Sequence, residues 1–348
     1  MIKVLIVDDS KVVQEFMEHI LTSDPDIRIV GIASSGHEAI KLVSEKSPDV
    51  ITMDFHMPDM NGSEATRSIM ESTPTPIVIV SGSMSTREVT KKFSLIEDGA
   101  LAVVLRPPGP QHPDFDIARN QLIQTVKLMS EIKVVRRFPC QRKVRKIASE
   151  YKLPEVVEKG DIQLIALGAS TGGPMALMKI LSSLPKELPV PVLIVQHISQ
   201  GFVKGFVEWL SVSSGIPLKI ASDGEKLVDG TGYVAPDGFH MEVRKGPVIH
   251  LNNLPPENGL RPSVDTLFRS VAQVFGKNAI GVLLTGMGRD GAEELKTMNK
   301  MGAITIAQDE ESSVIFGMPG EAVRIRAARY VLPLDKIAGL LLDLVKGK

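Results

Sequence analysis

Short apolar runs alternate with amphipathic stretches through the first third of the chain. The runs, which are typical of buried strands, cover residues 2–7, 27–32, 50–53, 77–80 and 101–105. Between them, residues 12–21 and 37–43 place apolar side chains at helical spacing. Regular alternation of strands and helices favours a parallel sheet with helices on both faces. We therefore expect a doubly wound α/β domain with a five-stranded parallel sheet over residues 1–125.

The same alternation resumes after residue 160. Apolar runs at residues 164–167, 192–195 and 280–284 each lead into a short polar or glycine-rich turn. We expect residues 161–348 to form a second doubly wound α/β domain. The intervening residues, 126–160, lack sustained apolar periodicity and are rich in lysine and arginine, which is typical of a solvated linker. A contact strip for an acidic partner is the alternative interpretation of this basic linker.

Composition and charge narrow the class of protein. With 348 residues, of which 43% are hydrophobic and 23% charged, the chain suits globular domains with sizeable cores. The net charge of −1 argues against a nucleic-acid partner. The single cysteine, Cys140, excludes an internal disulfide and fits a reducing compartment. No apolar run approaches the ~20 residues that cross a bilayer, and residues 1–9 do not resemble a signal peptide. We expect a cytoplasmic protein without direct membrane insertion.

Polar residues gather where the strands of the first predicted sheet end. Asp8 and Asp9 follow the first strand, Asp54 follows the third and Ser81 follows the fourth. The carboxyl ends of parallel strands meet at one edge of a sheet, where sites form. Carboxylates placed this close repel one another, and a divalent cation such as Mg²⁺ relieves the repulsion. Singly, each acid would be a helix cap or a loop residue; together they predict a metal-assisted phosphoryl site at Asp54.

Three segments carry a resemblance to a known family: Val7-Asp8-Asp9-Ser10, Asp54-Phe55-His56-Met57-Pro58-Asp59-Met60-Asn61-Gly62 and Val80-Ser81-Gly82. They resemble the receiver domain of two-component response regulators, with its flavodoxin-like sheet, over residues 1–125. The resemblance implies phosphorylation of Asp54 by a histidine kinase. It also implies Mg²⁺ held by Asp8 or Asp9, by Asp54 and by the His56 backbone carbonyl. Ser81 is the implied switch hydroxyl that follows the phosphoryl group.

The segment after the predicted fifth strand departs from the receiver pattern. Arg106 stands where the family has a lysine before proline, and Val103 stands where it usually has an aromatic switch residue. Arginine keeps the positive charge but is larger and planar, so the two residues are not interchangeable. Phosphorylation remains the expectation, because it depends on the acids and the metal. How Arg106 and Val103 transmit the signal stays open.

The strand predicted at residues 164–167 leads into Gly168-Ala169-Ser170-Thr171-Gly172, which fits the G-x-S-x-G pattern of a nucleophile elbow. A sharp turn there would expose the Ser170 hydroxyl at the sheet edge. Two alternatives remain at this point: a phosphate cradle for a nucleotide, and an ordinary helix cap. The nucleotide alternative lacks a P-loop lysine and the G-x-G-x-x-G spacing. A serine nucleophile requires a histidine and a carboxylate elsewhere in the chain.

Candidates for both groups follow other predicted strands. His197 comes directly after the run at residues 192–195, and His240 is a rival for the same role, whereas His250 ends an apolar run and is expected to be structural. Asp290 lies in a glycine-rich turn, where it either caps a helix or accepts the Nδ1–H of His197. The chain order differs from that of α/β-hydrolases, but a triad is defined by its geometry.

A second resemblance favours the nucleophile. The segments that carry it are Gly168-Ala169-Ser170-Thr171-Gly172-Gly173-Pro174, Gln196-His197, Arg261-Pro262-Ser263-Val264-Asp265, Leu284-Thr285-Gly286-Met287-Gly288-Arg289-Asp290-Gly291 and Gln308-Asp309-Glu310. They are similar to the CheB family of chemotaxis protein-glutamate methylesterases, which also has a receiver domain in front. The resemblance implies Ser170 as nucleophile, His197 as base and Asp290 as orienting acid. Thr171 and Met287 fall at positions that border the family's site.

The CheB resemblance also implies a substrate and its control. The substrate would be a glutamyl methyl ester, or a glutamine side-chain amide, on the cytoplasmic helices of a chemoreceptor. No cofactor is expected in the esterase site. In the family the unphosphorylated receiver blocks this site and phosphorylation relieves the block. The competing interpretations are a nucleotide-binding regulator and a response regulator that acts only by binding.

Overall fold

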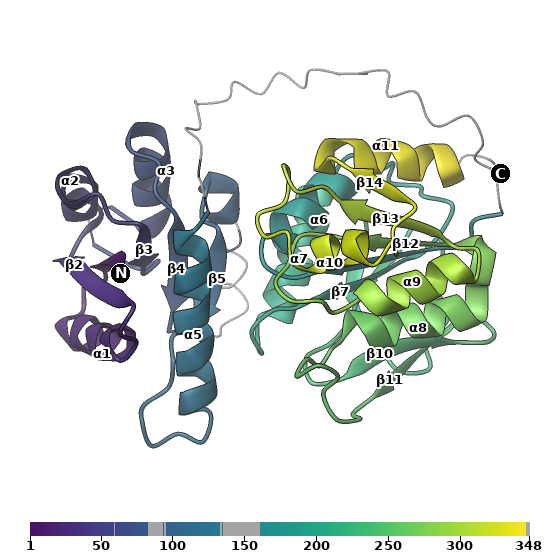
Figure 1. Ribbon diagram of the computed structural model, residues 1–348, viewed down its shortest axis with the longest axis horizontal. Coiled ribbons are helices and arrows are strands. Elements are labelled where there is room, and N and C mark those ends of the chain that lie inside the picture. Colours follow the sequence, from purple (N-terminus) through teal and green to yellow (C-terminus); the bar gives the residue numbers. More distant parts are fainter. Residues whose placement is uncertain (59, 83–92, 94, 133, 135–160, 346–348) are drawn as a thin grey trace. The chain divides into compact units, whose positions relative to one another are not determined.

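The computed structural model describes residues 1–58, 60–82, 93, 95–132, 134 and 161–345. The chain divides into two compact units, Met1–Lys146 and Ile147–Lys348. Figure 1 shows the helices and strands of each unit, which are described separately below.

The first unit contains one sheet of parallel strands with helices packed against it. Its elements are β1 (Ile2–Val7), α1 (Lys11–Thr22), β2 (Ile27–Ala33), α2 (Gly36–Lys46), β3 (Val50–Met53), α3 (Gly62–Ser72), β4 (Ile77–Ser81), β5 (Ala102–Leu105) and α5 (Phe115–Ser130). The strand order is β2-β1-β3-β4-β5, and every pair is parallel. Helix α2 packs beside α3, and α1 packs beside α5 (Figure 1). The expected doubly wound sheet is thereby confirmed.

Local sequence explains where two of these helices begin. The Ser35 side chain accepts a hydrogen bond from the Glu38 backbone N–H, and the Asn61 side chain accepts from the N–H groups of Ser63 and Glu64. Such caps satisfy N–H groups that have no partner inside the helix. The strands are apolar because both faces of a parallel sheet are covered, and β3 and β4 are buried along their whole length.

The second unit is larger and contains a second parallel sheet. Its elements are β6 (Leu164–Ala169), α6 (Gly173–Leu181), β7 (Val192–Gln196), α7 (Val203–Ser214), β8 (Leu218–Ile220), β9 (Gly232–Val234), β10 (His240–Arg244), β11 (Val248–Asn252), α8 (Val264–Phe275), a 3₁₀ turn (Gly276–Asn278), β12 (Ala279–Leu283), α9 (Ala292–Lys300), β13 (Ile304–Gln308), α10 (Met318–Arg324), β14 (Tyr330–Leu332) and α11 (Leu334–Val345). The sheet runs β14-β13-β12-β6-β7-β9-β8, with parallel pairs throughout.

Helices cover both faces of this second sheet, which confirms the expected fold class. Figure 1 shows α6 and α11 on one side of the strands and α8 and α9 on the other. Alternate residues of β6, such as Leu164 and Ala166, share a buried cluster with Leu267 and Phe268 of α8. A separate antiparallel hairpin of β10 and β11 was not among the predicted elements.

The expected basic linker lies largely outside the described residues. Helix α5 ends at Ser130, so residues 126–130 belong to this helix and not to a linker, because Val126 and Met129 are buried. Cys140 lies outside the described residues. Among the described helices, none has the length and apolar character that a bilayer crossing requires.

Candidate functional site

Ser170, His197 and Asp290 follow three strands that are neighbours in the second sheet. Ser170 directly follows β6, His197 directly follows β7, and Asp290 lies in the turn between β12 and α9. Strand β6 pairs with β12 on one side and with β7 on the other. Segments that are far apart in the sequence therefore meet at the carboxyl edge of one sheet, where sites of parallel sheets form.

The side chains of His197 and Asp290 are in direct contact. His197 Nε2 lies 2.9 Å from Asp290 Oδ2, and the two side chains are only 9% and 1% exposed. The sequence predicted a contact through Nδ1, so this detail is corrected: the ring presents Nε2 to the acid. Between the described side chains there is no hydrogen bond from the Ser170 hydroxyl to the imidazole. Nδ1 is the ring nitrogen that remains to take a proton.

Both oxygens of the Asp290 carboxylate accept hydrogen bonds from groups at the start of α8. Ser263 Oγ donates to Oδ1 at 2.7 Å, the Val264 N–H donates to Oδ2 at 2.6 Å, and the Asp265 N–H donates to Oδ1 at 3.2 Å. Burial opposes ionisation of Asp290, but the bonds from His197, Ser263 and Val264 outweigh it and hold the pKa of this carboxyl below its usual value.

These donors at the start of α8 were not predicted as site residues. Their segment, residues 261–265, had drawn attention only as part of a family resemblance. The hydrogen bonds span 25 to 27 residues of sequence, so no local pattern indicates them. Asp290 therefore accepts a bond from His197 and at the same time caps α8. The sequence had offered Asp290 as a cap of the following helix, α9, and this detail is corrected, because the N–H groups that it accepts belong to α8.

The turn after β6 holds Ser170 through its main chain. The Ser170 N–H donates to the Thr285 carbonyl at 3.0 Å, and the Gly173 N–H donates to the Ser170 carbonyl at 2.8 Å. Gly172 has a φ of 77°, a conformation that residues with a Cβ rarely adopt. The sequence predicted a sharp strand-to-helix turn at this position, and the structure confirms the turn.

Several backbone N–H groups beside the turn have no hydrogen-bond partner in the described part of the chain, among them those of Thr171, Gly172 and Met287. Thr285 Oγ1 donates to the Thr171 carbonyl at 2.9 Å and accepts from the Ile315 N–H at 2.9 Å. Thr285 thereby links the turn after β6 to the loop that contains Ile315. Met287 is 47% exposed and so lies at the surface. Unpaired backbone N–H groups of this kind are the donors from which oxyanion holes are built.

The rival histidines are engaged elsewhere. His240 is buried, and its ring nitrogens contact the Pro255 carbonyl and Thr266 Oγ1, each at 3.2 Å. His250 Nδ1 contacts Asp223 Oδ1 at 3.0 Å on the β10–β11 hairpin. Neither ring contacts Ser170 or Asp290 in the described structure. His197 is thus the histidine that the fold brings to the acid.

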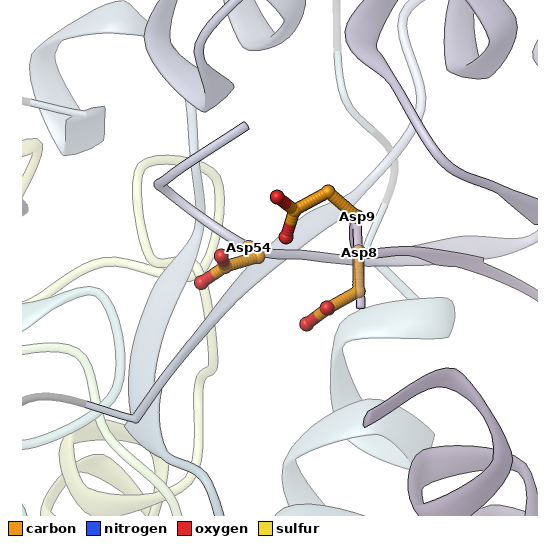
Figure 2. A group of neighbouring side chains, drawn as sticks. All are labelled: Asp8, Asp9 and Asp54. Carbon is orange, nitrogen blue, oxygen red and sulfur yellow. The ribbon is translucent and has the colours of Figure 1, made fainter. Parts of the chain in front are cut away.

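In the first unit, Asp8, Asp9 and Asp54 form an acidic cluster. Figure 2 shows their three side chains together, and one oxygen from each lies within 4.8 Å of the others. Burial raises the pKa of Asp8 to about 6, and the charge of Asp54 contributes. Burial likewise raises the pKa of Asp54. Hard carboxylate oxygens at this spacing fit a Mg²⁺ ion, which would relieve the crowding of negative charge.

Of the predicted switch residues, Arg106 lies beside this acidic cluster. Ser81 is buried at the end of β4, and its carbonyl accepts the Arg106 N–H at 2.8 Å. The Arg106 guanidinium lies 4.0 Å from Asp8 Oδ2. The His56 N–H donates to Asp54 Oδ2 at 3.3 Å. Val103 pairs with Ile79 inside the sheet and is half-buried.

Comparison with protein families matches two regions of the chain. Residues 4–112 match the response regulator receiver domain, and residues 165–341 match the CheB methylesterase family. Both families are those that the sequence motifs had predicted. The two matches fall within the two compact units of the structure.

Individual proteins extend the likeness over the whole chain. A protein-glutamate methylesterase/protein-glutamine glutaminase of Geobacter metallireducens is 51% identical over all of both chains. A protein of the same name from Nitrosospira multiformis is 53% identical over 99% of this chain and 97% of its own. The crystal structure of the Thermotoga maritima CheB methylesterase catalytic domain is 37% identical, with a TM-score of 0.52 over 53% of this chain and 100% of that one. This chain belongs to the CheB methylesterase family and carries a response regulator receiver domain in front of its hydrolase domain.

Proposed function

We propose that this protein hydrolyses glutamyl methyl esters, and glutamine side-chain amides, on the cytoplasmic helices of chemoreceptors under the control of phosphorylation. The names of its relatives support the substrate class. The observation that carries the catalytic assignment is the buried contact between His197 and Asp290 at the sheet edge where the Ser170 turn lies.

In the proposed first half-reaction, Ser170 Oγ attacks the ester carbonyl carbon and His197 Nδ1 takes the hydroxyl proton. Asp290 accepts the Nε2–H, keeps the ring in this tautomer and stabilises the imidazolium. The free N–H groups of Thr171 and Met287 bind the oxyanion, and one such donor is typically worth ~3–4 kcal/mol of transition-state stabilisation. The imidazolium then protonates the departing methoxide, and methanol leaves.

The second half-reaction releases the product. Water attacks the acyl-serine while His197 removes one of its protons, and the collapse of the intermediate returns that proton to Ser170. The products are a glutamate side chain and the free enzyme. With an amide substrate the same steps release ammonia in place of methanol.

Control is proposed to reside in the first unit. Asp54 accepts a phosphoryl group from a chemotaxis histidine kinase, and the Ser81 hydroxyl follows that group. Arg106 contributes positive charge beside Asp8. Mg²⁺ held by Asp8 or Asp9, Asp54 and the His56 carbonyl supplies charge that offsets the carboxylates and the phosphoryl oxygens when it is bound. The unphosphorylated receiver restrains the esterase, and phosphorylation releases it.

Methanol release from methylated receptor membranes tests the proposal. We expect release to rise when a small-molecule phosphodonor is added, and Ser170→Ala to abolish it while the protein stays folded. Release at the wild-type rate from Ser170→Ala would exclude the proposed nucleophile. Calorimetric titration with nucleotides separates the competing nucleotide-binding function, for which no heat of binding is expected.

A further inference from the structure

Gln196 ends β7, one residue before His197, and its side chain is only 3% exposed. Its Nε2 donates to the Ser170 carbonyl at 2.8 Å and to the His197 carbonyl at 2.7 Å. Both N–H groups of one amide therefore join the main chain of the proposed nucleophile to that of the proposed base.

The remaining contacts between these two segments are few. The His197 N–H donates to the Ala169 carbonyl at 2.9 Å, which holds the strand ends in register. The Ser170 carbonyl accepts only one further bond in the described structure, from the Gly173 N–H. Without the amide of Gln196, no hydrogen bond would link residue 170 itself to the end of β7.

The oxygen half of the Gln196 amide is unsatisfied. Gln196 Oε1 is buried and has no hydrogen-bond partner among the described residues. An unpaired buried acceptor typically costs ~1–3 kcal/mol, which an apolar side chain of the same shape would avoid. Gly173 also fits this side chain closely, because a Cβ at that position would overlap Oε1. A purely packing role would be better served by an apolar residue.

We propose that Gln196 is a positioning residue, whose amide fixes the distance between the Ser170 hydroxyl and the His197 ring. The inference rests on the proposed function, because it assigns Gln196 to the geometry of that reaction. Gln196 does not touch the reacting atoms. Its loss therefore affects the chemical step and not the binding of the receptor helix.

Gln196→Met in the full chain, with the phosphodonor present, tests this role. Methionine keeps the length of the side chain but donates no hydrogen bond. We expect kcat for methanol release to fall by roughly 10- to 100-fold with KM within about twofold, since small displacements of reacting groups have effects of this size. The rate at which a fluorophosphonate labels Ser170 should fall by the same factor.

Gln196→Glu is the second variant, because it keeps the shape and Oε1 but turns an oxygen toward both carbonyl groups. We expect its kcat to fall further than that of Gln196→Met. Thr305→Val is the matched control: Thr305 is buried near the opposite end of β13, where its Oγ1 donates to the Ala327 carbonyl at 2.8 Å and accepts from the Arg329 N–H at 2.9 Å. It should lose stability and keep kcat.

Each rate is expressed per folded molecule, from the fluorescence of Trp209, the single tryptophan, which is buried in the second unit. A wild-type kcat and labelling rate in Gln196→Met would overturn the inference and leave the proposed function intact. A loss of folded protein without a change in kcat would also overturn it. If wild type itself released no methanol and did not label, the proposed function would fail first.

Discussion

Asp290 both caps the start of α8 and contacts His197, the proposed catalytic base. Its two carboxylate oxygens accept bonds from His197, Ser263 and the first N–H groups of α8. Three of these donors come from one rigid helix start, so the carboxylate is held in a fixed orientation before any substrate binds. Such preorganisation lets the imidazolium form beside a charge that does not need to move.

We predict that Asp290→Asn lowers kcat for methanol release by roughly 10²- to 10⁴-fold. If the new oxygen takes the bonds from Ser263 and the Asp265 N–H, the amide nitrogen must face His197 Nε2 and also the Val264 N–H, whose hydrogen bond is lost. It then donates to Nε2 and leaves the proton on Nδ1, where the ring can no longer accept the serine proton. Steady-state methanol release measures the effect.

The chain supplies a matched control for this substitution. Asp223 forms a similar contact with His250 Nδ1 at 3.0 Å, but Asp223 is exposed and follows β8, which β7 and β9 separate from β6 in the sheet. Asp223→Asn should keep the wild-type rate. Equal activity in the Asp290 and Asp223 variants would reduce Asp290 to a helix cap.

At the scale of elements, α8 and α9 cap one another. Asp290, just before α9, accepts N–H groups of α8, while Asp265, in the first turn of α8, accepts the N–H groups of Gly291 at 3.0 Å and Glu294 at 3.4 Å. Acidic groups are favoured at helix N-termini. This reciprocal capping brings the two buried carboxyl groups of Asp265 and Asp290 close together. The pKa of Asp265 is raised to about 7, mainly by burial and secondly by the negative charge of Asp290.

The raised pKa of Asp265 predicts a pH dependence of stability. The folded state favours the protonated form of Asp265. Below the pKa of about 4 that this residue has in the unfolded chain, Asp265 is protonated in both states and does not lower the free energy of unfolding. Its ionisation lowers the free energy of unfolding as the pH rises from about 4 to about 7. Urea unfolding of wild type and Asp265→Asn, followed by Trp209 fluorescence, should show the variant gaining stability relative to wild type across this range. A difference that is constant with pH would contradict the assigned titration.

Several elements of the second unit could be predicted from the sequence, whereas the contacts between them could not. Apolar runs located β6, β7 and β12 to within about two residues, because buried parallel strands are continuously apolar. Glycines marked the turn at Ser170 because its backbone requires them. Other features depend on contacts between distant segments, which no local pattern records. These features are the order of the strands in the sheet, the ring nitrogen of His197 that faces Asp290, and the hydrogen bonds of the Gln196 amide. The β10–β11 hairpin was missed because its polar residues interrupt the apolar run.

At the scale of the whole molecule, the proposed control requires that the two units act on each other. We predict that a chain beginning near Asp161 releases methanol faster than the unphosphorylated full chain, because the restraint resides in the first unit. Adding a phosphodonor should raise the full chain toward the truncated rate and leave the truncated chain unchanged. Asp54→Asn in the full chain is the control and should stay at the restrained rate with or without the donor, because the amide cannot accept the phosphoryl group. Equal rates for the truncated and the unphosphorylated full chain would dispose of autoinhibition and leave the esterase chemistry standing.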